Sequence, residues 1–403
     1  MSAHDTDILI VGGGMVGASL ATALAPLSLK VTVVEAKPPR DAGQPSYDDR
    51  STALSYGSRR IMETLGLWPD LQAAATPING IHVSDRGHFG ATRINHDEQG
   101  VPALGYVVEN RALGPMLWQA MERSGVETQC PATIADVDVS KDRAEVTVNT
   151  TDGDVVYRAR LLVVADGARS ATRELLGIRA EAIHYGQTAV ITNVTPEKFH
   201  EHVAYERFTD TGPLAFLPMS NGRCSVVWTL PPQQAETVLA LDDAAFLLAL
   251  QEAFGHRLGR LTRCGSRHSY PLFLVRAERI HGDRHVLVGN AAHGLHPVAG
   301  QGFNLGLRDV AALADVIADA DDAGAAATLR GYAQWREADH SRVVSLTDGL
   351  VRLFTTEFMP VKLARGAGLV ALDLLGAPRK AFARQTMGLR GKLPRLARGV
   401  RLR

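Results

Sequence analysis

The sequence has no long hydrophobic run. No stretch reaches the ~18 apolar residues that a membrane-spanning helix needs, and Asp373 interrupts the nearest candidate, 366–377. The amino-terminal segment also lacks the positive charge of a signal peptide, because Asp5 and Asp7 stand where basic residues should be. We therefore expect a cytoplasmic protein with neither a membrane span nor a leader.

Cysteine is also scarce. Cys130, Cys224 and Cys264 are the only three among 403 residues, and they show neither metal-ligand nor redox spacing. Reduced thiols in a cytoplasmic protein are the expected state. The sequence shows no metal-ligand set and no nucleophilic triad, so we predict no metal and assign no catalytic residue.

Net charge is absent overall but unevenly distributed. Residues 379–403 carry nine Lys or Arg and no Asp or Glu, so the remainder has a charge of −9. A basic end of this kind suits an anionic membrane surface, which would place the protein peripherally on the inner face of the cytoplasmic membrane. The alternative is a solvated, disordered end. Nucleic acid is not expected, since this end has one aromatic residue, Phe382, and no nucleic-acid-binding motif.

The amino terminus carries a dinucleotide-binding pattern. An apolar strand over 7–11 leads into Gly12-Gly-Gly14-Met-Val16-Gly17, a helix follows, and a second strand ends in Glu35. In this context the first glycine makes a tight turn, the second admits a pyrophosphate, and the third packs helix on strand. Glu35 is placed to hold a ribose hydroxyl pair. The pattern alone leaves FAD and NAD both open.

Two more strand-to-turn junctions follow the same plan. A buried strand over 161–165 ends in Asp166-Gly167, and a strand over 284–288 leads through small residues to a helix that opens near Gln301. Gly300 and Gly302 flank that helix start, whose free N–H groups and positive dipole end suit an anion or a ring that becomes anionic when reduced. The alternative is an ordinary glycine-rich turn before a capped helix.

The remaining pattern predicts an α/β protein: a Rossmann-like FAD-binding domain with an inserted antiparallel-sheet substrate domain and a helical C-terminus. Residues 133–148 are typical of a half-exposed hairpin, those between 182 and 231 of successive strands, and those after Tyr332 of helices broken by Pro360 and Pro378. We predict a discontinuous FAD-binding domain over 1–75, 105–178 and 276–342, a sheet domain over 76–104 and 179–275, and a helical segment with the basic tail over 343–403.

The three motifs, in this order, resemble the single-component flavoprotein aromatic hydroxylases. The stretch from Leu287 to Asp309 is similar almost throughout to the signature of the ubiquinone-biosynthesis hydroxylases, in particular the 2-polyprenyl-6-methoxyphenol hydroxylase branch. The resemblance implies bound FAD, with NADPH or NADH and O2 as co-substrates. The cofactor-binding positions that it implies are Gly12, Gly14, Val16, Gly17 and Glu35 for the adenosine and pyrophosphate, Arg50, Arg111 and Asp166 for further contacts, and Asn290, Pro297, Gly300, Gln301, Gly302 and Asn304 around the flavin.

The implied reaction is hydroxylation of the aromatic ring of a polyprenyl phenol, with other ubiquinone-pathway proteins as possible partners and no prediction of oligomeric state. His293 and His296 lie inside the flavin turn, where a structural role is expected. One position departs from the wider superfamily, because Asn290 replaces an Asp. Asn keeps an acceptor oxygen but loses a charge. Two alternatives stay open: a flavin hydroxylase of a soluble aromatic compound, and a non-catalytic flavin-fold scaffold that Asn290 alone supports.

Overall fold

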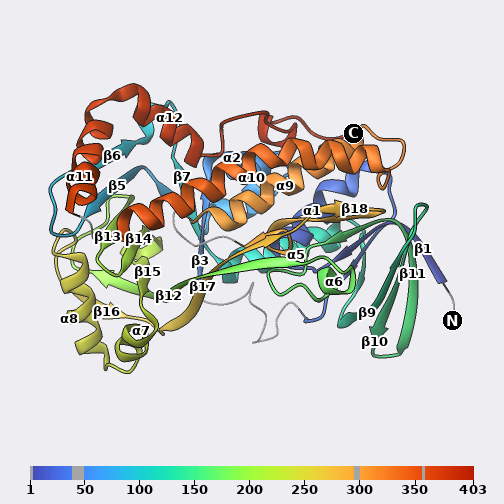
Figure 1. Ribbon diagram of the computed structural model, residues 1–403, viewed down its shortest axis with the longest axis horizontal. Coiled ribbons are helices and arrows are strands. Elements are labelled where there is room, and N and C mark those ends of the chain that lie inside the picture. The colour runs from blue at the N-terminus through green and yellow to red at the C-terminus, as the bar shows by residue number, and fades with distance from the viewer. Residues whose placement is uncertain (1–2, 39–49, 295–299, 356–358) are drawn as a thin grey trace.

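The computed structural model describes residues 3–38, 50–294, 300–355 and 359–403. A parallel sheet lies at one end of an elongated molecule and a larger sheet at the other, and long carboxy-terminal helices run between them (Figure 1). This arrangement confirms the predicted α/β class with a helical C-terminus. No helix in the described ranges is long and apolar enough to cross a bilayer, and the three cysteines form no disulfide.

The parallel sheet is built on β1 (Ala3–Val11), whose central residues Ile8, Leu9 and Ile10 are fully buried. Such apolar runs form strands that are covered on both faces. The strand order is β18 (His281–Gly282), β19 (His285–Leu287), β11 (Gly153–Val164), β1, β2 (Val31–Val34) and β8 (Glu127–Gln129). From β19 to β8 the neighbours pair in parallel, and β18 pairs with β19 in the antiparallel direction. The predicted hairpin is present as β9 (Ala132–Val139) and β10 (Ala144–Thr150), which extend this sheet beside the first half of β11.

Helices cover one face of this sheet. Helix α1 (Met15–Leu24) follows β1 and contacts α5 (Asn110–Arg123) and α9 (Gln301–Ala318). Their apolar faces share one buried core with the strands. Short helices η1 (Ala25–Leu27), α2 (Tyr56–Thr64) and α3 (Trp68–Gln72) contribute to the same core, whereas the residues next to α6 (Ala171–Leu175) and those of η4 (Gly289–Ala291) pack in a second core with β9 and β10.

The larger sheet runs in the order β20 (His293–Gly294), β17 (His268–Ala277), β12 (Ala180–Pro196), β15 (Cys224–Leu230), β14 (Gly212–Pro218), β13 (Val203–Thr209), β5 (Gly80–Asp85) and β6 (Ala91–Asn95), with β16 (Leu261–Cys264) beside β12. The prediction of an antiparallel sheet needs one correction, because β13 and β5 pair in parallel. These two strands are distant in sequence, so no hairpin sets their direction. Helices α7 (Pro232–Leu239) and α8 (Asp243–Phe254) cover this sheet, and α4 (His96–Gln99) and η3 (Ser220–Gly222) lie in its connections.

A small sheet contributes to the junction of the two halves. It consists of β3 (Ser51–Ser55), β7 (Gly105–Glu109) and β4 (Ala75–Ile78). Its strand β3 contacts α9, and β4 contacts β14 of the larger sheet. The small sheet therefore joins the parallel sheet's helices to the larger sheet.

The carboxy-terminal helices begin and end at other residues than the sequence predicted. Helix α10 (Ala326–Thr355) runs through the predicted boundary at 342–343 without interruption. Pro360 and Pro378 lie inside the first turns of α11 (Met359–Leu374) and α12 (Gly376–Thr386), not between helices. The first turn tolerates proline because its N–H groups have no partner within the helix.

The basic carboxy-terminal segment is folded, which corrects the alternative of a disordered end. Beyond α12, Leu396 and Leu402 are buried in the core of the parallel-sheet half, and η6 (Leu396–Arg398) contacts α2. The Arg395 guanidinium contacts the Asp315 carboxylate on α9 and lies 3.0 Å from that of Asp319. This end of the chain is therefore held against the protein.

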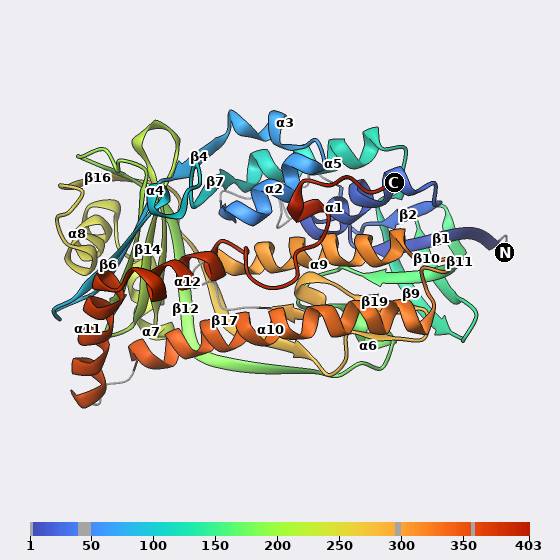
Figure 2. The ribbon, with the colours of Figure 1, turned by 90° about the horizontal axis from the view of Figure 1, so that it is seen from above.

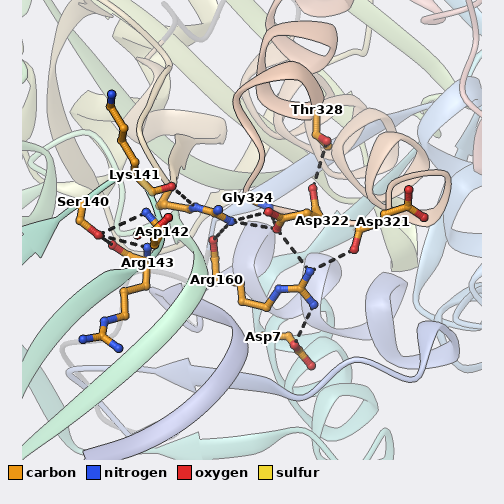
Figure 3. A network of polar contacts seen from close by, with 11 residues as sticks. Asp7, Ser140, Lys141, Asp142, Arg143, Arg160, Asp321, Asp322, Gly324 and Thr328 are labelled. Carbon is orange, nitrogen blue, oxygen red and sulfur yellow. Dashed lines mark hydrogen bonds and ion pairs between the residues drawn. The ribbon is translucent and has the colours of Figure 1, made fainter.

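Figure 3 shows a polar network that joins β1, β11 and the β9–β10 turn to the α9–α10 connection. The Arg160 guanidinium donates to the carbonyl of Asp321 at 3.0 Å, and that of Arg284 donates to both carboxylate oxygens of Asp322 at 2.7 and 2.9 Å. Desolvation opposes ionisation of Asp322, but these donors outweigh it and lower the pKa of its carboxyl. A Cβ at Gly324 would lie 1.9 Å from the Arg160 carbonyl oxygen, so this turn accepts only glycine. The network fixes the α9–α10 connection to the sheet.

Candidate functional site

The three predicted turns meet at one edge of the parallel sheet. Val11 pairs with Val34 on one side and Val164 on the other, and Val164 pairs with Leu287. The strands are parallel, so the turns that follow them emerge together at their carboxyl ends. Ligands of open α/β sheets bind at this edge.

Glycine at positions 12 and 17 is required by contact. A Cβ on Gly17 would lie 1.8 Å from the carbonyl oxygen of Gly12, so α1 can start this close to β1 only without a side chain. Gly12 has φ +103°, and a Cβ there would lie 2.6 Å from the carbonyl oxygen of Ala165. The first glycine turn therefore packs directly on the Asp166-Gly167 turn. Gly14 is the N-cap of α1 and has no side chain to occupy the free N–H groups of the first turn.

Glu35 follows β2 directly and holds the glycine turn in place by hydrogen bonding. Its Oε2 accepts the N–H of Gly13 at 2.6 Å, and its Oε1 accepts that of Lys37 at 3.0 Å. The carboxylate is nearly buried. A carboxylate offers about four acceptor positions, so Glu35 can orient the glycine turn and still accept from a ligand's hydroxyl groups.

Asp166 presents an unsatisfied oxygen at the same edge. Its Oδ2 accepts the N–H of Thr172 at 3.1 Å, while its Oδ1 is buried without a hydrogen-bond partner among the described residues. A buried acceptor without a partner costs stability unless something else binds it. This oxygen is therefore a candidate ligand contact.

The third turn packs on the first through Val16. A Cβ at Gly289 or at Gly306 would lie 3.0 Å from Cγ2 of Val16, so the Val16 side chain sits between η4 and α9. Asn290 in η4 is exposed. Val16 therefore acts by packing two turns together, a role that its place in the motif does not reveal.

The start of α9 lies where it was predicted. Gly300 is its N-cap in the left-handed region at φ +58°, and no side chain in the described part of the chain caps the first turn. Gly302 has open space beside it, whereas Gln301 is buried, with Nε2 3.4 Å from the Thr386 carbonyl oxygen. Pro297 and His296 lie outside the described residues.

The side chain of Asn304 connects α9 to β3 and is not exposed at the protein surface. Its Oδ1 accepts the N–H of Ser55 at 2.8 Å, and its Nδ2 donates to the carbonyl oxygens of Ala53 and Gly300 at 2.7 Å each. The side chain is buried, so its role here is to hold the helix start in place.

The two arginines occupy different surroundings. Arg50 lies over the Tyr270 ring at 4.8 Å, and its carbonyl oxygen accepts the N–H of Asn110 at the start of α5. Arg111 is exposed and forms an ion pair of 2.7 Å with Glu109. Only Arg50 is thus packed between the small sheet and β17 of the larger one.

Comparison with known proteins identifies the family. A family model described as an FAD binding domain matches residues 5–347. Ubiquinone hydroxylase UbiL of Rhodospirillum rubrum is 41% identical, with the alignment covering 98% of this chain and 93% of the relative. The 3-demethoxyubiquinol 3-hydroxylase of Escherichia coli is 33% identical over 96% of this chain and 100% of its own. This chain belongs to the family of FAD-dependent ubiquinone-biosynthesis hydroxylases.

The fold agrees with that membership. The crystal structure of p-nitrophenol 4-monooxygenase PnpA from Pseudomonas putida aligns with a TM-score of 0.79 at 18% identity, over 97% of this chain and 100% of that one. The protein is an FAD-dependent aromatic monooxygenase, a class that uses NAD(P)H and O2. The glycine turn that no Cβ could enter, together with the unsatisfied oxygen of Asp166, fits an FAD at the edge described above.

A buried charge network behind the turn over 289–294 was missed by sequence reasoning. Asp309 on α9 is fully buried, and its Oδ1 accepts from Arg336 Nε at 2.7 Å and lies 2.7 Å from His340 Nε2. Its Oδ2 accepts the N–H of Gly289 at 3.2 Å. Desolvation opposes ionisation, but the pKa of Asp309 is held well below its ordinary value by His340 and Arg336. The network joins the turn that starts at Gly289 to α9 and α10.

His293 belongs to the same cluster. Its ring centroid lies 4.1 Å from that of His340, and its Nε2 is 3.2 Å from Asp309 Oδ2, although neither ring nitrogen has a hydrogen-bond partner among the described residues. Burial lowers the pKa of His293 to about 3. Two histidines and an aspartate resemble a metal-ligand set, but Arg336 already neutralises Asp309, so we assign a structural role. In the sequence, the only sign of this charge network was the charged pair Arg308-Asp309 at the end of the motif over 287–309.

Proposed function

We propose that the protein hydroxylates the aromatic ring of a polyprenyl phenol of the 2-polyprenyl-6-methoxyphenol type during ubiquinone biosynthesis. The observation that carries this proposal is the 41% identity to UbiL, which extends over almost the full length of both chains. The relationship includes the larger sheet as well as the FAD edge. Since NAD(P)H and O2 are shared by the class, it is the sheet half that would decide the substrate.

The residues at the edge of the parallel sheet would hold FAD. In this proposal Gly12, Gly14 and Gly17 bring backbone N–H groups to the pyrophosphate, and the dipole of α1 favours its charge. Glu35 accepts from the adenosine ribose hydroxyls while it orients Gly13. Asp166 receives a donor on its unsatisfied Oδ1. FAD supplies the activation of O2 and the transfer of one oxygen atom to the ring.

The start of α9 would face the flavin ring. Its first-turn N–H groups are not used by a capping side chain, and the helix is 18 residues long. Negative charge placed there is stabilised by the helix dipole. Gly302 leaves the approach open, and Asn304 keeps the helix start against β3. Arg50, packed on Tyr270, would contact FAD from the small sheet, and Arg111 would do so after leaving Glu109.

Two other functions follow from the alternatives left open above. A flavin hydroxylase of a soluble aromatic compound would have the same FAD edge, and a non-catalytic scaffold would keep the fold without turnover. Removal of the basic segment 379–403 does not separate them, because Leu396 and Leu402 in that segment are part of the core. Membrane association and contacts with other pathway proteins belong to the proposal as well.

Turnover by the purified FAD-loaded protein tests the proposal. We expect a prenylated methoxyphenol to stimulate NADPH oxidation, and one atom of ¹⁸O from labelled O2 to appear in the hydroxylated product by mass spectrometry. The same phenol without its prenyl chain is the matched control and should stimulate far less. Equal stimulation by both phenols would favour the soluble-substrate alternative, and no stimulation by any phenol would favour the scaffold.

A further inference from the structure

Helix α11 has one face fixed to the larger sheet. The Arg365 guanidinium lies 2.5 Å from the buried carboxylate of Asp85, the carbonyl of Leu369 accepts from Thr92 at 2.7 Å, and Asp373 Oδ1 accepts the N–H of Arg93 at 2.7 Å. At Gly366 the helix backbone lies so close to the β5–β6 connection that a Cβ would be 2.8 Å from the Phe89 carbonyl oxygen. These anchors recur at helical spacing and define the inner face.

The outer face of α11 is apolar although it is exposed. A surface helix normally turns charged and polar side chains to water. From residue 364 to the start of α12, every exposed residue is instead apolar: Ala364, Ala367, Gly368, Ala371, Leu374, Leu375, Gly376, Ala377 and Pro378. Leu374 and Leu375 are 77% and 55% exposed. We name the turn over 374–378 the corner.

The corner protrudes and is followed by positive charge. Both ribbon views place α11 at the outer edge of the larger-sheet end, away from β1, with α12 leading back towards α9 (Figures 1 and 2). Lys380 and Arg384 on α12 are exposed, and no ion pair is recorded for either among the described residues. Residues 374–403 contain no Asp or Glu. Arg379, by contrast, pairs with Glu98 at 3.2 Å.

We propose that this corner is the membrane-docking element: Leu374 and Leu375 insert among the lipids of an anionic bilayer, and Lys380 and Arg384 bind the headgroups. Helices that lie at a bilayer surface combine an apolar face with basic residues in this way. The inference rests on the proposed function, because a prenylated substrate would be taken from the bilayer. It confines the contact to the corner and to the first part of the basic segment 379–403, whose last part packs on the core through Leu396 and Leu402.

A second copy of the chain fits the same surface less well. Small residues such as Ala367 and Ala371 do allow close packing of helices. A symmetric interface centred on the corner, however, would bring Lys380 and Arg384 near their own copies, since such an interface uses the same patch twice. Like charges would then oppose association, whereas an anionic surface attracts them.

Vesicle binding by the FAD-loaded, full-length protein tests the inference without any substrate. We expect sedimentation with phosphatidylcholine vesicles that contain phosphatidylglycerol, weaker binding to pure phosphatidylcholine, and loss of binding at high salt. The double variant Leu374→Ser/Leu375→Ser should bind the anionic vesicles at least about tenfold more weakly than the unaltered protein. Lys380→Gln/Arg384→Gln should lose about 25-fold at low salt, from roughly fivefold for each basic residue. Leu248→Ser is the matched control, because this leucine on α8 is 72% exposed, and it should bind like the unaltered protein.

Three results would overturn the inference: no binding of the unaltered protein to anionic vesicles, unchanged binding of both corner variants, or an equal loss in Leu248→Ser. If the Leu374→Ser/Leu375→Ser variant changed only the oligomeric state by size-exclusion chromatography, the corner would be a self-association surface and the inference would be wrong. Hydroxylation of a detergent-dispersed prenylated phenol is measured separately. Failure of that reaction with intact vesicle binding would reject the proposed function and leave the docking element standing.

Discussion

Asp309 and Arg336 form a fully buried ion pair, 2.7 Å from Oδ1 to Nε, directly behind the turn that would carry the flavin. The second carboxylate oxygen of Asp309 accepts the N–H of Gly289, the residue that begins that turn. One side chain therefore connects α10 to the cofactor edge. The position of the turn that starts at Gly289 therefore depends on a buried charge.

Asp309→Asn should destabilise the protein strongly. The variant leaves Arg336 with Asp339 alone, at 2.7 Å, and Asp339 also pairs with Arg308 at 2.8 Å, so the buried cluster keeps an uncompensated positive charge. Removal of one member of a buried pair costs about 3–5 kcal/mol. Urea denaturation followed by circular dichroism measures the change. Asp70→Asn is the control, because Asp70 forms an exposed pair with Arg123 at 3.0 Å, and such pairs contribute about 0–1 kcal/mol. Equal effects of the two substitutions would refute the structural role of Asp309.

Gly17→Ala should abolish FAD retention. The added Cβ would lie 1.8 Å from the Gly12 carbonyl oxygen, so α1 would have to move away from the glycine turn. The ratio of FAD to protein after gel filtration measures the loss. Gly331→Ala within α10 is the matched control, since a Cβ there meets nothing within 4 Å. Full flavin content in Gly17→Ala would contradict the assignment of this turn to the cofactor.

Because His293 is buried, we expect the free energy of unfolding to fall in acid. Its pKa falls from an ordinary 6.5 to about 3 on folding, mainly through desolvation. The unfolded chain therefore binds the proton more readily, and stability that is complete above pH ~6.5 is lost as the pH falls towards 3, by about 1.4 kcal/mol per unit. Buried His82, whose pKa is lowered to about 4, adds to this slope.

His293→Gln should make that slope shallower by about 1.4 kcal/mol per pH unit between pH ~6 and ~4, because one titrating group is removed. Urea denaturation at a series of pH values measures it. His256→Gln, at an exposed position, should leave the slope as it is. A slope unchanged in His293→Gln would mean that His293 does not titrate with unfolding.

Asn290→Asp separates the enzyme from the scaffold alternative. Asn290 is exposed in η4, so a carboxylate there is easily hydrated. If Asn marks a subgroup of active enzymes, FAD retention should change little. A large gain in FAD content, measured by absorbance after gel filtration, would instead favour a scaffold that has lost cofactor binding through this position.

The predictable part of the molecule was the part set by local rules. The glycine turn, Glu35 and the start of α9 follow from short motifs whose backbone geometry is fixed by glycine and by helix ends. The parallel β13–β5 pair could not be foreseen, because it joins strands that are far apart in the chain. Asn304 stays a predicted neighbour of the flavin, but its three hydrogen bonds to Ser55, Ala53 and Gly300 could not be foreseen from the sequence.

The basic segment 379–403 is a second case in which the sequence alone could not predict the tertiary contacts. Its charge was evident from sequence, but apolar residues spaced between the charges fold it onto the core, as Leu396 and Leu402 do. Exposed apolar residues on α11 became visible only when its inner face was known. Composition thus indicated an attraction to anionic surfaces, and tertiary structure was needed to say which residues remain available for it.

The most direct test of the account is mass spectrometry of the quinone pool in a strain that lacks this protein. We predict accumulation of a 2-polyprenyl-6-methoxyphenol or another under-hydroxylated prenyl phenol during aerobic growth, and the missing hydroxyl would identify the ring position. Reintroduction of the unaltered gene should restore the pool, and a Gly17→Ala copy should not. A quinone pool that stays unchanged, in a strain without a second hydroxylase of this family, would contradict the proposed role in ubiquinone biosynthesis.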